Sequence, residues 1–148
     1  MTGSHLDSFP VHYETAVSWG HLDSFQHVNN TIYFRYFEDA RIQYFEQIGL
    51  TQHMARTGIG PILARTSCVF RQALGYPERI LVGARIEDIG TDRFTMMYRI
   101  VSKKTGKIAA EGDGRIIIYD YNQQQKAALP PTIRARIDAL ETGEPHPD

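Results

Sequence analysis

The sequence predicts an α+β domain in which an antiparallel β-sheet wraps around one long central helix. Two observations predict this arrangement. Aromatic residues form a wide stripe along a single helical segment in the first third of the chain, and apolar residues recur at every second position in the short segments that follow it. The apolar stripe of a helix repeats about every 3.6 residues and that of a strand every two, so the change of period separates one long helix from a run of strands.

The composition is that of one globular domain. The 148 residues are 42% hydrophobic and 22% charged, which is enough apolar material for a full core. The net charge of −1 leaves no basic footprint for nucleic acid, and no apolar run is long enough to span a bilayer. The first residues lack the charged and apolar regions of a secretory signal, and the single cysteine, Cys68, excludes an internal disulfide. We therefore expect a cytoplasmic protein without a nucleic-acid partner or a membrane span.

We divide the chain into a flexible N-terminus at residues 1–10, a single domain at residues 11–140 and a frayed C-terminal tail at residues 141–148. The pentapeptide His-Leu-Asp-Ser-Phe occurs twice, at residues 5–9 and 21–25. Only the second copy is followed by His-Val-Asn-Asn and a helix, so we interpret the repeat as coincidence.

The first half of the domain is expected to form a strand, a loop and the long helix. Alternating residues from Val11 to Trp19 predict the strand, and residues 20–29 form the loop. The helix then runs from Thr31 to Gly49, with Asn29 or Asn30 as its N-cap. At about 100° per residue, its apolar side chains cover about half of the circumference. They are Tyr33, Phe34, Tyr36, Phe37, Ala40, Tyr44, Phe45 and Ile48, and a stripe this wide needs a large concave apolar partner.

The second half is expected to supply that partner as a sheet. A helical turn and a loop at residues 51–60 lead to four strands with alternating apolar residues, at residues 62–71, 80–86, 94–100 and 108–118. Short connections, such as the hairpin signal from Lys103 to Gly106, predict that these strands form an antiparallel meander to which the first strand is added. Gly112 and Gly114 on the inward face of the last strand predict that the helix lies close against it. A short terminal helix with proline at its start is expected at residues 130–140.

The loop before the long helix carries the groups that suggest chemistry. Residues 19–30 contain a carboxylate, histidine and side-chain amides, all immediately before the helix N-terminus. That terminus exposes unpaired N–H groups and the positive end of the helix dipole, which stabilise a carbonyl oxygen that becomes an oxyanion. A carboxylate a few residues upstream could act on the same carbonyl. The arrangement predicts acyl transfer or acyl hydrolysis.

The run from Asp23 to Tyr33 carries a resemblance to a known family. It reads Asp-Ser-Phe-Gln-His-Val-Asn-Asn-Thr-Ile-Tyr and is continued by residues 36–41. It resembles the signature of the 4-hydroxybenzoyl-CoA thioesterase-like family of acyl-CoA thioesterases, and the similarity extends from Val11 to about Tyr121, in pattern only beyond the helix. The Asp-x-x-x-His-Val-Asn-Asn part also resembles the active-site segment of plant acyl-ACP thioesterases. The resemblance implies a hotdog fold, with its sheet wrapped around one long helix, and hydrolysis of an acyl-CoA or acyl-carrier thioester to free acid and thiol.

The resemblance also implies roles for three residues. Asp23 matches the family's catalytic carboxylate, acting as nucleophile or as the base that activates water; the alternative is that it only forms an Asx-turn or caps the helix. Asn30 matches the position whose backbone amide polarises the thioester carbonyl. His27 matches a histidine in the active site of the plant enzymes; alternatively, it only orders the loop through bonds to the backbone.

Other candidates carry less weight. Glu38 is the reserve carboxylate, because another hotdog clade uses a glutamate within the helix, although an i,i+3 ion pair with Arg41 is favoured. His21, Asp23 and His27 are three possible metal ligands, but their spacing matches no compact metal motif, so no metal is expected. His21 also departs from many relatives, which have a second aspartate at that position.

The expected protein is a homo-oligomeric acyl-CoA thioesterase, a dimer or a tetramer as in relatives. It needs no cofactor, because coenzyme A is part of the substrate. The chief enzymatic rival is a hotdog dehydratase or hydratase that pairs His27 with Glu38. Such relatives usually carry a Gly/Pro-rich segment after the histidine, and residues 28–30 are Val-Asn-Asn. A non-catalytic acyl-CoA-binding protein is the rival from another class.

Overall fold

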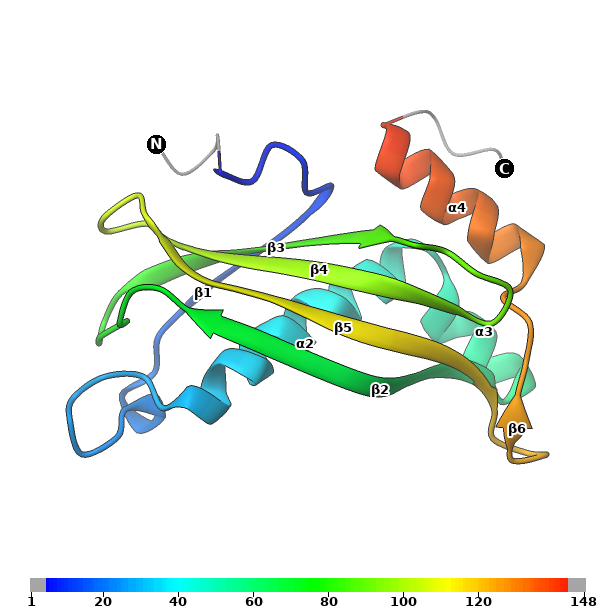
Figure 1. Ribbon diagram of the computed structural model, residues 1–148, viewed down its shortest axis with the longest axis horizontal. Coiled ribbons are helices and arrows are strands. Elements are labelled where there is room, and N and C mark those ends of the chain that lie inside the picture. Colours follow the sequence, from blue (N-terminus) through cyan, green and yellow to red (C-terminus); the bar gives the residue numbers. More distant parts are fainter. Residues whose placement is uncertain (1–4, 144–148) are drawn as a thin grey trace.

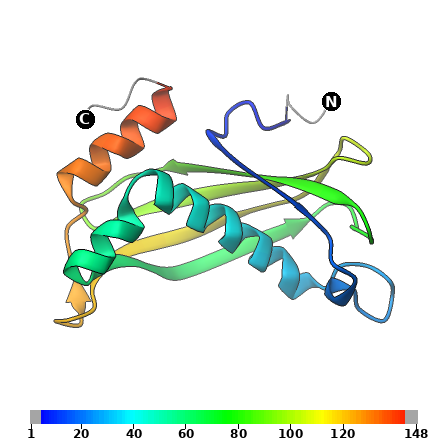
Figure 2. The same cartoon turned by 180° about the vertical axis from the view of Figure 1, so that it is seen from behind.

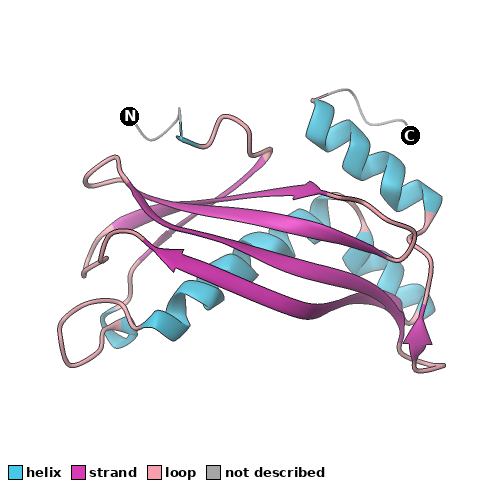
Figure 3. Cartoon of the chain, viewed as in Figure 1, coloured by secondary structure: helices cyan, strands magenta, loops and turns pink. Residues whose placement is uncertain are grey.

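One six-stranded antiparallel sheet forms the frame of the molecule, and helix α2 lies along one face of it (Figure 1, Figure 2). The computed structural model describes residues 5–143. The elements, coloured by type in Figure 3, are β1 (Val11–Ala16), the 3₁₀ turn η1 (Trp19–His21), α2 (Asn30–Gln47), α3 (Leu50–Thr57), β2 (Ile59–Phe70), β3 (Arg79–Glu87), β4 (Arg93–Ser102), β5 (Ile108–Asp120), β6 (Gln125–Lys126) and α4 (Pro131–Thr142). The predicted α+β architecture, a sheet wrapped around one long helix, is confirmed.

The order of the strands differs from the predicted meander. It is β1-β3-β4-β5-β2, with every neighbouring pair antiparallel. Short hairpins join β3, β4 and β5 as expected, but β2 pairs with β5. β1 occupies the edge of β3 that β2 would need, with Val11 opposite Ala84 and Ala16 opposite Arg79. The predicted four-stranded meander is therefore wrong, because the chain between β2 and β3 crosses from one edge of the sheet towards the other.

Helix α2 supplies one side of the core. Asn29 is its N-cap, because the Asn29 Oδ1 accepts a hydrogen bond from the N–H of Thr31 at 3.0 Å. The helix ends at Gln47, and Gly49 follows in the left-handed conformation with a φ of 78°. The buried side chains match the predicted stripe except that Phe34 is half-buried and Arg41 is added: Tyr33, Tyr36, Phe37, Ala40, Arg41, Tyr44, Phe45 and Ile48.

Sheet and helix approach closely at Gly112. A Cβ atom there would lie 2.8 Å from Cζ of Phe37, and closer still to Cε2 of that ring and to the carbonyl oxygen of Ser67. The Phe37 ring stacks on Tyr98, with centroids 4.7 Å apart and an interplanar angle of 11°. The prediction that Gly112 faces the helix is confirmed. Gly114 instead has the Tyr98 hydroxyl and Leu63 as its nearest neighbours.

The N-terminal strap, residues 5–10, differs from the flexible lead-in that we expected. Leu6 and Phe9 are buried and form with Val101 a small cluster separate from the main core that α2 covers. Gly83 makes room for them, because a Cβ atom there would lie 2.8 Å from Cδ2 of Leu6 and 2.9 Å from Cβ of Phe9. The strap is therefore held by its apolar side chains, and the first four residues lie outside the described part.

The two ends of the predicted domain also shift. β1 stops at Ala16, and Trp19 belongs to η1 and is 70% exposed, so the strand does not extend to Trp19 as predicted. α4 continues to Thr142, where we expected fraying from residue 141. The reason is Glu141, whose carboxylate accepts hydrogen bonds from the Tyr44 hydroxyl and, at 2.9 Å, from the N–H of Ile86. Residues 144–148 lie outside the described part, and no helix within residues 5–143 is long and apolar enough to cross a membrane.

Candidate active site

The loop between η1 and α2 folds back on itself like a small hairpin (Figure 1). Leu22 and Val28 form an isolated antiparallel bridge at its base. Inside the loop the N–H of Asp23 donates to the carbonyl of His27 at 2.9 Å, and the N–H of Gln26 donates to the carbonyl of Asp23 at 3.1 Å. These backbone bonds fix the turn that carries the Asp23 side chain.

Asp23, His27 and Asn30, the three residues predicted from the resemblance, border one pocket of about 390 Å³. The complete lining is Asp23, Phe25, His27, Val28, Asn30, Tyr33, Phe70, Arg71, Gln72 and Ala73. One wall is the loop and the first turn of α2, and the other is the end of β2 with the residues that follow it. The pocket thus combines polar groups from one segment with apolar and basic groups from a distant one.

The Asp23 carboxylate has one bonded and one open oxygen. Its Oδ1 accepts a hydrogen bond from the N–H of Phe25 at 2.8 Å, which is the Asx-turn that we considered as the alternative to catalysis. Its Oδ2 has no hydrogen-bond partner among residues 5–143. The helix cap falls to Asn29 rather than to Asp23. The turn therefore orients the carboxylate and leaves one oxygen for a water molecule or a substrate.

The backbone amide of Asn30 is an open donor in the first turn of α2. The N–H of Thr31 is bonded to the side chain of Asn29, and the N–H of Ile32 is bonded to the Asn29 carbonyl at 2.9 Å. The N–H of Asn30 has no acceptor within the described part of the chain. An unpaired amide at the positive end of a helix is suited to binding a developing negative charge.

The two histidines of the loop have different surroundings. The carbonyl of His27 holds the loop, while its exposed side chain lines the pocket and has no hydrogen-bond partner among the described residues. The side chain of His21 is bonded to Ser18 and Tyr36. Within residues 5–143, no group of three or more His, Cys, Asp or Glu side chains could hold a metal ion, so His21, Asp23 and His27 do not converge as a ligand set.

Glu38 lies away from this pocket. Its carboxylate is 3.8 Å from Nη2 of Arg41, so the predicted i,i+3 ion pair is confirmed, and Nη1 of the buried Arg41 donates to the Tyr98 hydroxyl at 3.1 Å. The Glu38 side chain is 54% exposed and borders a different surface hollow with Tyr13 and neighbouring helix residues. The structure therefore does not bring Glu38 to the pocket that His27 lines, as the pair of a dehydratase would require.

Cys68 is half-buried on β2. Burial raises the pKa of its thiol to about 11. The thiol is therefore protonated near neutral pH and is a poor nucleophile.

The wall formed by the end of β2 was missed from the sequence. The ring of Phe70 meets that of Tyr33 edge to face, with centroids 4.9 Å apart, and Arg71 follows at the rim. Nothing in the pattern of β2 marks these residues, because Phe70 continues its alternation and Arg71 resembles any polar strand end. They reach the site only because β2 pairs with β5.

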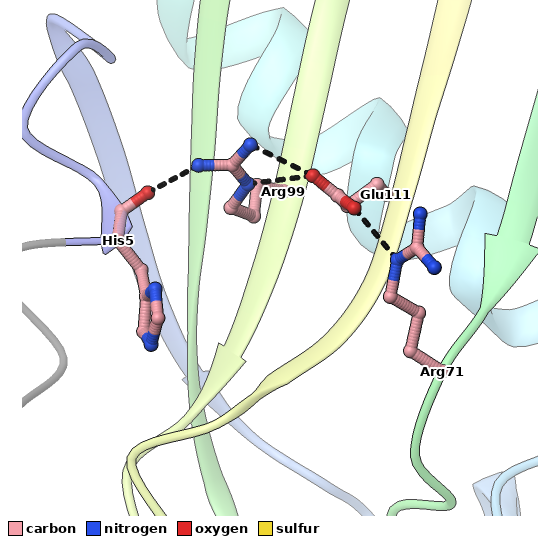
Figure 4. A network of polar contacts seen from close by, with 4 residues as sticks. All are labelled: His5, Arg71, Arg99 and Glu111. Carbon is pink, nitrogen blue, oxygen red and sulfur yellow. Dashed lines mark hydrogen bonds and ion pairs between the residues drawn. The ribbon is translucent and has the colours of Figure 1, made fainter.

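Arg71 is held in place by a chain of charges that reaches the N-terminal strap (Figure 4). Its Nε donates to Oε2 of Glu111 at 2.7 Å, and the other Glu111 oxygen lies 2.7 Å from Nη2 of Arg99. Nη1 of Arg99 donates to the carbonyl of His5 at 2.8 Å. Burial raises the pKa of Glu111, but the hydrogen bonds from the two arginines outweigh it and hold that pKa below its ordinary value. One carboxylate thus orients two guanidinium groups, one of them at the pocket.

The chain is similar in sequence and in fold to several known proteins. The family model of the thioesterase-like superfamily matches residues 17–137. The long-chain acyl-CoA thioesterase FadM of Escherichia coli is 21% identical over 120 residues, which cover 81% of this chain and 91% of FadM. A thioesterase from Thermus thermophilus, solved in complex with coenzyme A and Zn, is 30% identical with a TM-score of 0.81, and the match covers 94% of this chain and 98% of that one. The fold is also that of SAV2348 from Staphylococcus aureus, solved in complex with CoA, at 14% identity and a TM-score of 0.85 over 91% of this chain and 85% of that one.

Proposed function

Because this chain belongs to the thioesterase-like superfamily, we propose that it hydrolyses an acyl-CoA thioester in the pocket that Asp23 and Asn30 share. One observation carries the proposal. A carboxylate with an open oxygen and a helix amide without an acceptor border the same pocket. The thioesterase from T. thermophilus, complexed with coenzyme A, supports CoA as the thiol part of the substrate.

The amide of Asn30 binds the thioester carbonyl in this proposal. Its N–H donates to the carbonyl oxygen, and the dipole of α2 adds positive potential at the same point. Negative charge accumulates on that oxygen when the carbonyl carbon becomes tetrahedral, so the bond strengthens in the transition state. The Asn30 amide therefore stabilises the transition state more than it stabilises the bound substrate.

Asp23 supplies the attacking group by one of two routes. As a general base it takes a proton from water, and the hydroxide adds to the carbonyl carbon. As a nucleophile it forms an acyl anhydride that water then hydrolyses. In both routes the tetrahedral intermediate collapses by breaking the C–S bond, and the sulfur leaves as the CoA thiolate. A thiol with a pKa of about 8.5 leaves without prior protonation, so no general acid is required.

The aromatic wall of the pocket receives the acyl group. The rings of Tyr33 from α2 and Phe70 from β2 meet edge to face between the two walls, and the exposed ring of Phe25 lies in the loop. Tyr33 is already buried, so an apolar or aromatic acyl group gains free energy when it covers the exposed rings of Phe25 and Phe70. The side chain of His27 is left as a polar contact for the attacking water or the carbonyl.

The phosphates of CoA have a candidate position beside the thioester pocket. A second pocket, of about 440 Å³, is lined by Arg79, Lys103 and Lys104 and by the chain that connects β2 to β3. The same connection lines both pockets, so one extended ligand could reach across it. Arg79 and Lys103 both pair with Glu14, whereas Lys104 has no ion-pair partner among the described residues. Lys104 is therefore the cation most available to a phosphate.

The assembly that we propose is a dimer, or a tetramer built from two dimers, formed through β2. This strand is an edge of the sheet, and four of its large apolar side chains are exposed: Ile62, Leu63, Val69 and Phe70. An exposed apolar edge readily pairs with another strand. Phe70 also lines the thioester pocket, so a second copy on this edge would close the open side of the site. The acyl group would then lie between Asp23 of one subunit and strand residues of its partner.

The proposal includes the cofactor requirement and the cellular compartment. The route through Asp23 and Asn30 uses no cofactor beyond the CoA of the substrate. The protein is proposed to act in the cytoplasm, where acyl-CoA is available and the half-buried Cys68 stays reduced.

Thiol release from a panel of CoA esters tests the proposal. The wild-type protein should release free thiol, and Asp23→Asn should lower kcat by at least ~10²-fold with little change in KM, because the substitution keeps the size of the side chain but removes its charge. The melting temperature of the variant must match that of the wild type, since Asp23 also holds the turn. An absorbance change without free thiol would point to a hydratase, and binding without either signal would point to a carrier.

A further inference from the structure

The side chain of His21 ties the loop that carries Asp23 to the buried face of α2. Its Nδ1 lies 3.2 Å from the backbone nitrogen of Ser18 and 3.0 Å from the hydroxyl oxygen of Tyr36. The His21 and Tyr36 rings meet edge to face with centroids 5.6 Å apart. Tyr36 is only 1% exposed, so this contact fixes the start of the loop to the rigid core.

The contacts indicate which nitrogen of the imidazole is the acceptor. A backbone N–H can only donate, so Nδ1 of His21 accepts from Ser18, and the proton of the neutral ring lies on Nε2. With Nδ1 as the acceptor, the hydroxyl of Tyr36 donates to the same nitrogen, and the two donors share its single lone pair. Burial raises the pKa of Tyr36 above its ordinary value, which keeps the hydroxyl protonated. Nδ1 of His21 therefore acts as an acceptor that Ser18 and Tyr36 share.

His21 also closes the base of the loop through its backbone. Its carbonyl accepts from the N–H of Asn29 at 2.9 Å, directly beside the bridge between Leu22 and Val28. Asp23 follows two residues later and is bonded across the loop to His27. Only Leu22 separates His21 from Asp23 in the chain. A displacement of the His21 ring therefore displaces the Asp23 carboxylate as well.

We propose that His21 is a positioning residue for Asp23, which it serves by accepting hydrogen bonds from Ser18 and Tyr36. The inference rests on the proposed function, in which Asp23 is the reacting carboxylate. His21 itself neither lines the pocket nor touches the substrate. Its contribution is to keep the carboxylate at the distance from the Asn30 amide that the reaction needs.

Three variants separate this role from others. His21→Ala removes the acceptor, and His21→Asn places an amide oxygen about where Nδ1 was. Tyr36→Phe removes only the bond to the helix. The matched control is His12→Ala, because the ring of His12 also bonds to the backbone: its Nε2 donates to the carbonyl of Leu6 in the strap, away from the pocket.

Two measurements are made on each variant. Steady-state kinetics should show that His21→Ala lowers kcat by about 10- to 100-fold with KM nearly unchanged, since small displacements of a reacting group cost about this much. His21→Asn should recover most of the turnover, Tyr36→Phe should lie between the two, and His12→Ala should match the wild type. Amide hydrogen exchange of residues 22–28 should be faster in His21→Ala and close to wild type in His21→Asn.

The possible results are distinguishable. A His21→Ala protein with wild-type kcat overturns the proposal, whether or not its loop exchanges faster. Equal losses in His21→Ala and His21→Asn also overturn it, because the imidazole rather than an acceptor would then be required. If the wild-type protein releases thiol from no ester, the proposed function fails, and the exchange data alone decide whether His21 holds the loop.

Discussion

Replacing Gly112 by alanine should destabilise the domain strongly for a change of one methyl group. The added Cβ would lie 2.8 Å from Cζ of Phe37 and closer still to the carbonyl oxygen of Ser67, a backbone atom of the neighbouring strand that cannot rotate away. Phe37 cannot tilt freely either, because its ring stacks on Tyr98. Overpacking a close-packed core costs about 1–3 kcal/mol, and each kcal/mol lowers Tm by about 2–4 °C in a domain of this size. We therefore expect Tm to fall by about 2–12 °C.

Thermal unfolding followed by circular dichroism measures this fall, with two glycines as controls. No described atom lies within 4 Å of a Cβ built at Gly20, so Gly20→Ala should change the free energy of unfolding by less than about 0.5 kcal/mol. Gly114→Ala should lie between the two, because its contacts, at 3.1 Å to the Tyr98 hydroxyl and 3.2 Å to Cδ1 of Leu63, are tight but longer than those at Gly112. A Gly112→Ala protein as stable as Gly20→Ala would refute the close approach of sheet and helix.

Four further predictions concern the site and its frame. Glu38→Gln should keep most of the turnover that Asp23→Asn loses, because Glu38 lies outside the pocket; the reverse result in steady-state kinetics would move the chemistry onto the helix. Leu63→Asp should produce a monomer with reduced activity, and sedimentation of an unchanged oligomer would exclude pairing through β2. Lys104→Ala should raise KM for a CoA ester but not for a truncated thioester that lacks the nucleotide; equal effects on both would remove Lys104 from phosphate binding. Leu6→Ala should cost about 2–5 kcal/mol in urea unfolding, since Leu6 is fully buried, and a negligible loss would mean that the strap is not held.

The long helix could be predicted because its determinants are local. The spacing of its aromatic residues and the cap at Asn29 are set within a few residues of each other. The order of the strands could not, since it depends on which edge of β3 is free after β1 has paired with it. The alternation of β2 is equally compatible with either neighbour, and only the assembled sheet decides between them.

The two copies of the His-Leu-Asp-Ser-Phe pentapeptide also show that local sequence does not determine tertiary contacts. Phe9 of the first copy is 5% exposed, whereas Phe25 of the second is 80% exposed. The same five-residue sequence therefore does not determine whether its phenylalanine is buried. Phe9 is buried because Gly83 leaves space beneath it, and that space is created by a strand far away in the sequence.

The candidate site also contains residues that could be predicted from local sequence and residues that could not. Asp23, His27 and Asn30 could be predicted together because one loop and one helix start hold all three within a short stretch. Phe70 and Arg71 could not, because they enter the pocket from the end of β2 through its pairing with β5. Local patterns thus indicate the reacting groups, while the shape of the pocket comes from tertiary structure.

The contacts of the strap affect the order in which the protein folds during its synthesis. The bond between Arg99 and His5 joins residues 94 positions apart, and Leu6 needs Val101 to be covered. On the ribosome, the strap therefore emerges before its partner strands and stays uncovered until β4 has been synthesised and has paired with β3. We expect the strap to dock after these strands, and a nascent chain halted before β4 to expose Leu6 and Phe9 to chaperones and proteases.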